Sequence, residues 1–279
     1  MILTDTIGSA ELKFKQILEE FFIGIYDEKS LPSHGIWHHR RVWTYAKEVL
    51  TLFAGYDSDI ISRLSSKLII STYLHDIGMS VETGIKHGRH SRDLCIQFLN
   101  TFQLPENEYR DVLYAIENHD NKDYERIDSS VNELLTILSV ADDIDALGFT
   151  GIFRYAEIYL TRGIKPEDIS YPIRQNAGKR FDNLSTTLQL FNEFVRKHNK
   201  RYDLLDGFFE EYGNQAGSYQ FGRQEPSGHC GVVDMINETI RKKESFKSLL
   251  IKPMEQFPDK IIRWFIDGLR EEMYGCLVV

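Results

Sequence analysis

A histidine stands next to an aspartate in the stretch Thr72-Tyr-Leu-His-Asp-Ile-Gly-Met79, at the end of a helical pattern. Neighbouring side chains on a helix point about 100° apart, so His75 and Asp76 share one ligand only if it lies between them. An isolated pair of this kind is also what the polar end of a helix looks like. Metal coordination would need further nitrogen or oxygen donors from elsewhere in the chain.

Such donors occur on the apolar faces of the predicted helices. Each lies three, four or seven residues from apolar or small residues of its own helix, the spacing of one helix face. They are His38, His75, Asp76, His90, His119, Asp142 and Asp145. His39 and Asp143 are expected to turn away from these faces. Unpaired polar groups on buried faces cost roughly a few kcal/mol each, and one or two shared metal ions would satisfy all of them. Nitrogen and carboxylate donors without cysteine suit Fe, Mn, Co, Ni or Zn, or Mg where oxygen dominates.

Three segments together resemble a known signature. His38-His-Arg-Arg41-Val42, His75-Asp76 and Ala141-Asp142-Asp-Ile-Asp145-Ala-Leu-Gly148 resemble the H…HD…D pattern of the HD-domain superfamily of metal-dependent phosphohydrolases. The separations are 37 residues between the first two histidines and 66 between the two aspartates (75 − 38 and 142 − 76). The resemblance covers about residues 30 to 165 and implies an all-α helical bundle.

The resemblance also implies a ligand set. His38, His75, Asp76 and Asp142 would be the ligands of a mononuclear site. Members with two metals add two histidines between the HD pair and the last aspartate, and here these are His90 and His119. A binuclear site is therefore favoured, although one ion stays open. His87 competes with His90, which has the better relation to the apolar stripe through Leu94.

By the same resemblance, a divalent metal would activate water for attack on the phosphorus of a small, nucleotide-like phosphoester or phosphoanhydride. Asp76 could bridge two ions, and Asp145 could orient a ligand histidine or the water. Lys122 and Arg154 are the candidate phosphate contacts. Many members carry Lys or Glu three residues after the HD aspartate, where this sequence has Met79. The substrate class of better-defined branches therefore does not transfer directly.

Two other function classes stay open. Some HD-fold proteins hold a mixed-valence di-iron site and perform oxygenase chemistry with a similar ligand set. Others are regulatory modules without catalysis, although such relics commonly lose ligands and this set is intact. Homo-oligomerisation is left open as well.

The apolar spacing that positions these residues is helical nearly throughout, with no strand alternation. Gly78 should end the helix that carries the HD pair, and Gly213 to Gly231 is the expected loop. We expect a metal-binding helical core over 1–170 and a C-terminal helical extension over 171–279, or one continuous domain. The predicted helices span about 9–25, 36–53 and 58–76. Three more begin near 91, 105 and 130, and the C-terminal candidates span about 151–161, 176–198, 200–213, 231–248 and 256–273.

Composition restricts the function further. The chain has 279 residues, 42% of them hydrophobic and 27% charged, with a formal net charge of −9. This charge gives no electrostatic footprint for general nucleic-acid binding. The three cysteines are widely spaced and favour a reducing compartment. We expect no signal peptide and no membrane span, and hence a cytoplasmic protein.

Overall fold

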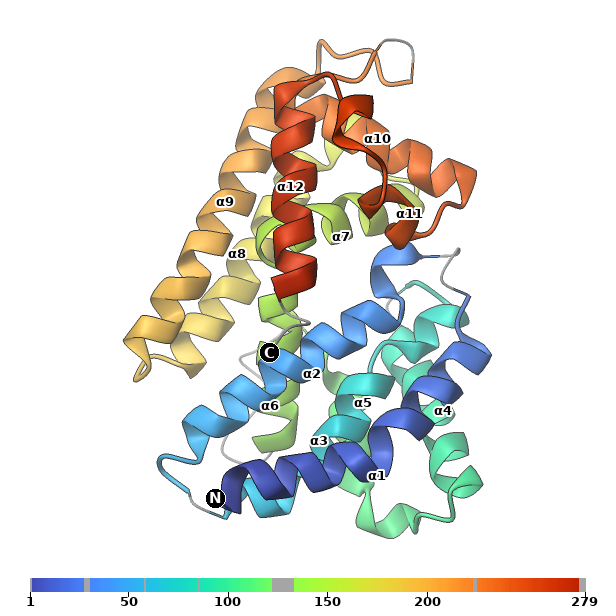
Figure 1. Ribbon diagram of the computed structural model, residues 1–279, viewed down its shortest axis with the longest axis vertical. Helices are drawn as coiled ribbons and strands as arrows, with labels where there is room; N and C mark the ends of the chain where they lie inside the picture. The colour runs from blue at the N-terminus through green and yellow to red at the C-terminus, as the bar shows by residue number, and fades with distance from the viewer. Residues whose placement is uncertain are drawn as a thin grey trace. The chain divides into compact units, whose positions relative to one another are not determined.

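The computed structural model is built from α-helices, as the sequence predicts (Figure 1). It describes residues 2–27, 31–57, 59–84, 86–121, 133–222 and 225–275. Within these ranges there are twelve α-helices, joined by short 3-10 turns, and no strand. The all-α fold class is therefore confirmed.

Backbone contacts divide the chain into two compact units. The first comprises Met1–Asp27 and His34–Ile144, and the second comprises Glu28–Ser33 and Asp145–Val279. Residues 145–170, which the sequence analysis placed with the metal-binding core, belong to the second unit. The short segment before His34 also belongs there, although the chain on both sides of it belongs to the first unit.

Helix α3 is the centre of the first unit. It packs against α1, α2 and α5, and every residue from Leu68 to its end at Leu74 is buried. The C-terminal half of α3 is therefore an interior segment. The α-helices of this unit are α1 (Ile2–Ile25), α2 (Ile36–Phe53), α3 (Ile60–Leu74), α4 (His87–Thr101), α5 (Arg110–Asn118) and α6 (Glu133–Asp145), whose last residue falls in the second unit.

Two differences from the predicted helices affect the site. Helix α4 begins at His87, four residues before the expected start at Ser91. Its buried stripe runs through Ser91, Cys95 and Phe98, while Leu94 is partly exposed. Helix α5 is preceded by the short turn Glu106–Glu108, because the chain turns after Pro105 before the helix starts. The predicted helix start at Ser130 lies outside the described residues.

In the second unit, α7 packs against α9, α10 and α12. The predicted helix over 176–198 is instead two helices, which meet at Leu188–Phe191 without a glycine or proline to mark the break. The expected loop after Gly213 is shorter, because α9 continues to Ala216. The helices are α7 (Gly148–Thr161), α8 (Ser170–Thr187), α9 (Asn192–Ala216), α10 (Gly228–Lys242), α11 (Phe246–Leu250) and α12 (Lys260–Gly275).

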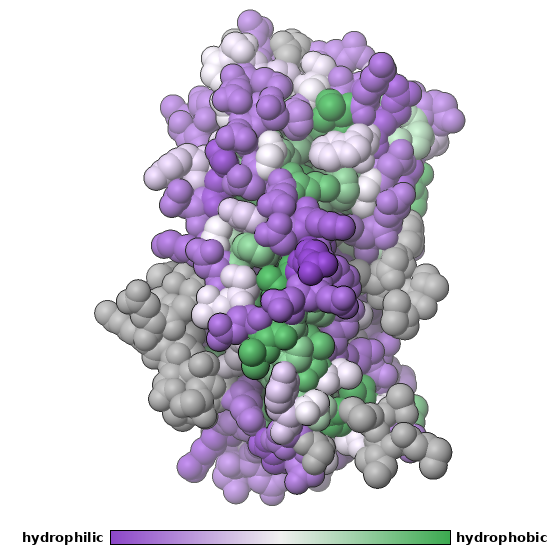
Figure 2. All heavy atoms as spheres, turned by 90° about the vertical axis from the view of Figure 1, so that its left-hand side faces the viewer, coloured by the Kyte–Doolittle hydropathy of each residue, from purple (hydrophilic) through white to green (hydrophobic). Residues whose placement is uncertain are grey.

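On the face shown in Figure 2, hydrophilic side chains predominate and smaller areas of apolar side chains appear between them. Among the described helices, none is both long enough and apolar enough to cross a membrane. Most of the large apolar side chains that the structure describes are buried within the two units.

Candidate metal centre

The turn after α3 positions the HD pair. His75 is the residue that caps the end of α3, and Asp76 follows it at the start of the short turn Ile77–Ser80. The backbone N–H of Gly78 donates to Ser91 Oγ at 2.8 Å. A Cβ at Gly78 would lie only 2.2 Å from the His87 carbonyl oxygen and 2.4 Å from the Ser91 nitrogen. A glycine here therefore lets the first turn of α4 pack directly on the turn that carries Asp76.

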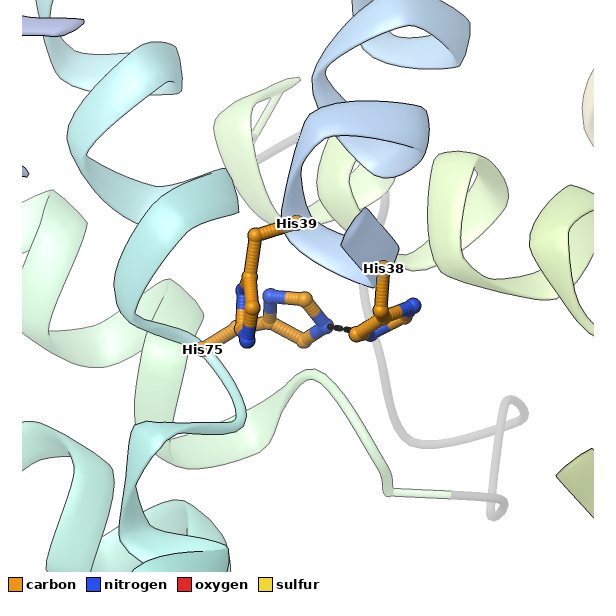
Figure 3. Close-up of side chains that lie close together, drawn as sticks. All are labelled: His38, His39 and His75. Atoms are coloured by element: carbon orange, nitrogen blue, oxygen red, sulfur yellow. Dashed lines mark hydrogen bonds between the residues drawn. The ribbon is translucent and has the colours of Figure 1, made fainter. Parts of the chain in front are cut away.

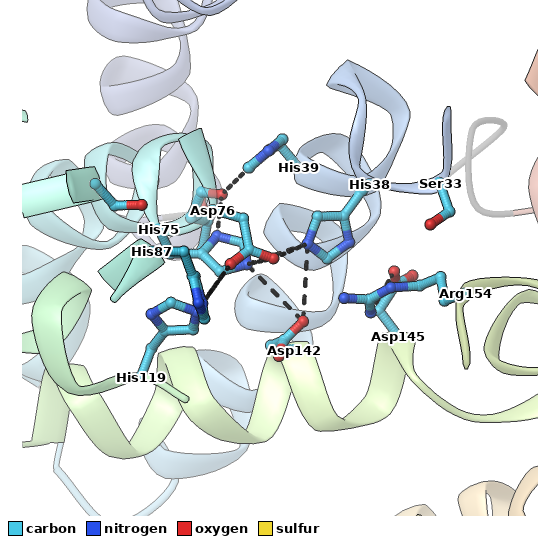
Figure 4. A network of polar contacts seen from close by, with 12 residues as sticks. Ser33, His38, His39, His75, Asp76, His87, His119, Asp142, Asp145 and Arg154 are labelled. Atoms are coloured by element: carbon cyan, nitrogen blue, oxygen red, sulfur yellow. Dashed lines mark hydrogen bonds and ion pairs between the residues drawn. The ribbon is translucent and has the colours of Figure 1, made fainter. Parts of the chain in front are cut away.

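One group of donor atoms gathers around His38 and His75 (Figure 4). Their Nε2 atoms are 3.1 Å apart, and Asp76 Oδ2 lies 3.4 Å from the first and 3.5 Å from the second. Asp142 Oδ1 lies 3.7 and 3.8 Å from the same two nitrogens. Donor atoms that bind one metal at about 2.1 Å stand roughly 3 to 3.5 Å apart, so these four donors have nearly the spacing of a coordination shell.

The tautomer of His75 follows from its backbone partner. Its Nδ1 lies 3.0 Å from the Thr72 carbonyl oxygen. Because a carbonyl oxygen only accepts, Nδ1 carries the hydrogen, and Nε2 is the ring nitrogen that can bind a proton or a metal ion. That nitrogen faces His38 Nε2 and two carboxylates. A proton or a metal ion between these atoms would interact favourably with all of them. The donor set therefore fits a cation.

A second group lies on the other oxygen of the same aspartate. Asp76 Oδ1 is 3.0 Å from His119 Nε2 and 3.3 Å from His87 Nε2. Both rings are anchored as His75 is, since His119 Nδ1 donates to the Ile116 carbonyl at 2.7 Å and His87 Nδ1 to the Gly84 carbonyl at 2.8 Å. Asp76, His87 and His119 thus form a second buried set of donors within 4.8 Å of one another.

The second group contains His87 and not His90. His90 is about one-third exposed, and its Nε2 lies 3.5 Å from Glu82. The sequence assignment measured helix phase from Leu94, which is partly exposed, whereas the buried stripe of α4 passes through Ser91 and Cys95. His87 lies four residues before Ser91 and starts that stripe. The structure therefore brings His87, and not His90, together with Asp76 and His119.

The position of His39 also differs from the sequence prediction. It was expected to turn away from the apolar face, yet it is fully buried beside His38 and His75 (Figure 3). Ring nitrogens of these three histidines lie within 4.8 Å of one another. The reason is that α1 covers the other side of α2 at this point, where the Phe22 ring lies 4.4 Å from that of His39. The first turn of α2 is consequently buried on both sides.

The predicted catalytic residues Asp145 and Arg154 form a buried ion pair in the second unit, with Arg154 Nη1 3.1 Å from Asp145 Oδ2. Nearby, Glu157 accepts hydrogen bonds from the backbone N–H of Ser33, at 2.9 Å, and from its hydroxyl. Figure 4 includes the ion pair and Ser33. Lys122, the other predicted phosphate contact, lies outside the described residues.

Electrostatics in the first unit keep the Asp76 carboxyl ionised. Burial alone would raise the pKa of the Asp76 carboxyl, but the His75 charge and contacts with His119 hold that pKa well below its usual range. Burial lowers the pKa of His87, yet contact with the Asp76 carboxylate outweighs this and raises it to about 9. The carboxylate of Asp76 therefore stays ionised and attracts cations, whether protons or metal ions.

Comparison with protein-family models, with curated proteins and with solved structures gives no match for this chain. The donor set itself therefore has to support any functional interpretation. Buried imidazoles and carboxylates from α2, α3, α4, α5 and α6 converge there, and such a set can hold a divalent cation.

Proposed function

We propose that the protein is a metal-dependent phosphohydrolase of the HD type. The observation that supports this most strongly is the position of Asp76 between two groups of donors. Its Oδ2 faces His38 and His75, and its Oδ1 faces His87 and His119. A carboxylate with imidazoles on both oxygens is suited to bridging two cations, the arrangement that two-metal phosphoester hydrolysis uses.

The proposed ligands of the first ion are His38, His75, Asp76 and Asp142, and those of the second are Asp76, His87 and His119. Four imidazoles with two carboxylates and no thiolate suit Mn, Fe, Co, Ni or Zn better than Mg, which prefers oxygen. A bound divalent ion would supply Lewis-acid activation of water and neutralise phosphoryl charge.

The chain itself contributes orientation. The Nδ1–H groups of His75, His87 and His119 are each held by a backbone carbonyl three residues earlier in the chain. Such outer partners fix the tautomer and the ring plane of a metal-binding histidine. Asp76, ionised and buried, provides the negative charge that retains the ions. These residues are thus prepared to bind metal without rearrangement.

The proposed substrate class is a small phosphorylated molecule, nucleotide-like or otherwise. Met79 cannot supply a charge to the phosphate, so contacts must come from other residues. Arg154 and Lys122 stay the candidates for this role, with the qualification that the Arg154 guanidinium already pairs with Asp145. Asp145 is accordingly proposed to hold that guanidinium in place.

A second candidate function is a di-iron oxygenase. The second donor group supports it, since two histidines with one carboxylate are the set that non-haem iron oxygenases use. Oxygen consumption separates the two functions, because phosphoester hydrolysis needs none. A non-catalytic HD module would show metal without turnover of either kind.

The experiment pairs metal analysis of the purified protein with a hydrolysis screen across nucleotides and small phosphoesters, with and without oxygen. The proposal predicts up to two metal ions per chain and hydrolysis that is independent of oxygen. His90→Ala is the matched control, because this imidazole lies outside the donor groups, whereas His119→Ala should lower both metal content and turnover. Two ions per chain without hydrolysis of any phosphoester would contradict the phosphohydrolase assignment.

A further inference from the structure

We infer that His39 is a positioning residue of the metal centre, which fixes the orientation of the His75 ring through a backbone carbonyl that both histidines share. The inference rests on the proposed metal site and adds a residue that is not among its proposed ligands. It concerns the metal affinity of the first donor group.

The shared acceptor is the carbonyl oxygen of Thr72. His39 Nδ1 lies 2.9 Å from it and His75 Nδ1 lies 3.0 Å from it. A carbonyl oxygen has two lone pairs and no hydrogen, so both nitrogens donate to it. Thr72 is in the last turn of α3, where carbonyl groups lack partners within the helix. Two imidazoles therefore satisfy one helix-end carbonyl, and each limits where the other can point.

The ring of His39 also lies beside both ligand rings. Its centroid lies 4.9 Å from that of His38 and 5.0 Å from that of His75, with interplanar angles of 63° and 64° (Figure 3). Phe22 from α1 supports it from another direction, with centroids 4.4 Å apart. Movement of His39 would thus disturb the 3.1 Å spacing between the Nε2 atoms of the two ligands.

Simple packing does not explain an imidazole at this position. The Nε2 atom of His39 is buried and makes no hydrogen bond with the described residues, which costs stability that a phenylalanine ring would not. What the imidazole provides, and phenylalanine lacks, is the Nδ1–H donor to Thr72.

Direct metal coordination by His39 is the alternative interpretation, since its ring nitrogens lie within 4.8 Å of those of His38 and His75. However, the group of four donors that includes both carboxylates consists of His38, His75, Asp76 and Asp142 and does not include His39.

Two substitutions separate the donor from the ring. His39→Asn keeps an N–H donor near the position of Nδ1 and removes the ring, whereas His39→Phe keeps a ring and removes the donor. Both are titrated with Co²⁺ in the absence of substrate, with the d–d absorption as the signal. His38→Ala and His90→Ala serve as the ligand and non-ligand controls.

We expect His39→Phe to weaken Co²⁺ binding by about 10- to 100-fold, the usual effect of losing an outer partner. His39→Asn should bind close to wild type, and the metal-free His39→Phe protein should unfold at a temperature no lower than wild type.

Three other results would overturn the inference, and each has a different meaning. If His39→Phe binds Co²⁺ as wild type does, His39 only fills space. If His39→Asn loses binding as completely as His38→Ala, His39 is itself a ligand. If wild type shows no Co²⁺ binding, the proposed metal site fails and the role of His39 fails with it. The first two results leave the proposed function intact.

Discussion

Both units bury aspartates and glutamates, but their surroundings differ in kind. In the second unit, the Asp145 carboxylate has the Arg154 guanidinium beside it, and Glu157 receives two hydrogen bonds from Ser33. In the first unit, imidazole nitrogens lie close to one another and to carboxylates. In the second unit, groups of the chain itself pair with the carboxylates. In the first unit, the clustered imidazoles and carboxylates could hold a metal ion.

The largest expected effect comes from removing the charge that both donor groups share. Asp76→Asn keeps the shape of the side chain but leaves two imidazole groups without their common carboxylate. We expect metal content to fall at both positions and phosphoester hydrolysis to drop by well over about 100-fold, beyond the effect of losing an outer partner. Metal analysis and turnover measure this, with circular dichroism as the check on folding. Unchanged metal content would show that Asp76 is not a ligand.

In the second unit, we expect a substitution to lower the stability of the protein and not its metal content. Arg154→Met leaves the Asp145 carboxylate buried without its guanidinium, because both side chains are almost fully covered. Removal of one partner of a buried ion pair costs about 3–5 kcal/mol, and urea unfolding would measure it. The double variant with Asp145→Asn should recover much of this loss. A loss below about 1 kcal/mol in the single variant would mean that the pair is more hydrated than its burial indicates.

A pH dependence should arise from Glu157. Burial raises the pKa of its carboxyl from 4.5 to about 7, against the opposing effects of Ser33 and Arg154. The folded state then holds its proton more tightly than the unfolded state. Its contribution to stability is full below about pH 4.5 and is lost as pH rises through 7, by on the order of 3 kcal/mol. Glu157→Gln should remove this loss, so that the variant gains stability relative to wild type at pH 8. Parallel pH profiles of the two proteins would contradict the assignment.

The smallest effect tests how the two donor groups are held. A Cβ at Gly78 would collide with the backbone of His87 and Ser91, at 2.2 and 2.4 Å. Gly78→Ala should cost about 1–3 kcal/mol and displace the start of α4. Because His87 belongs only to the second donor group, metal content should fall toward one ion per chain before the first is lost. Gly24→Ala, with open space around it, is the control. Retention of two ions would show that α4 tolerates the shift.

Much of the fold was accessible from periodicity. The apolar spacing predicted α2 with its correct ends. The prediction that Gly78 ends the helix of the HD pair was wrong, because α3 already ends at Leu74 and Gly78 lies in the short turn after it. The break between α8 and α9 was not predictable in this way, because no glycine or proline marks it. Helix existence follows from local spacing, whereas helix ends depend on contacts made elsewhere in the chain.

Most residues of the candidate site could also be predicted from the sequence. His38, His75, Asp76, His119 and Asp142 are brought together as the spacing indicated. His87 was passed over because the helix start was placed four residues late, which moved the buried face of α4. His39 was missed since a single helix pattern does not show that α1 covers its other side. Both errors concern burial by neighbouring helices, which sequence spacing does not contain.

The most direct test is anomalous X-ray diffraction from crystals of the protein grown with Mn²⁺ or Fe²⁺. We expect anomalous density on both sides of the Asp76 carboxylate, with one peak among His38, His75 and Asp142 and the other between His87 and His119. No peak should appear beside Glu157 or Asp145. Crystals that contain the metal but show no density at Asp76 would contradict the proposed metal centre.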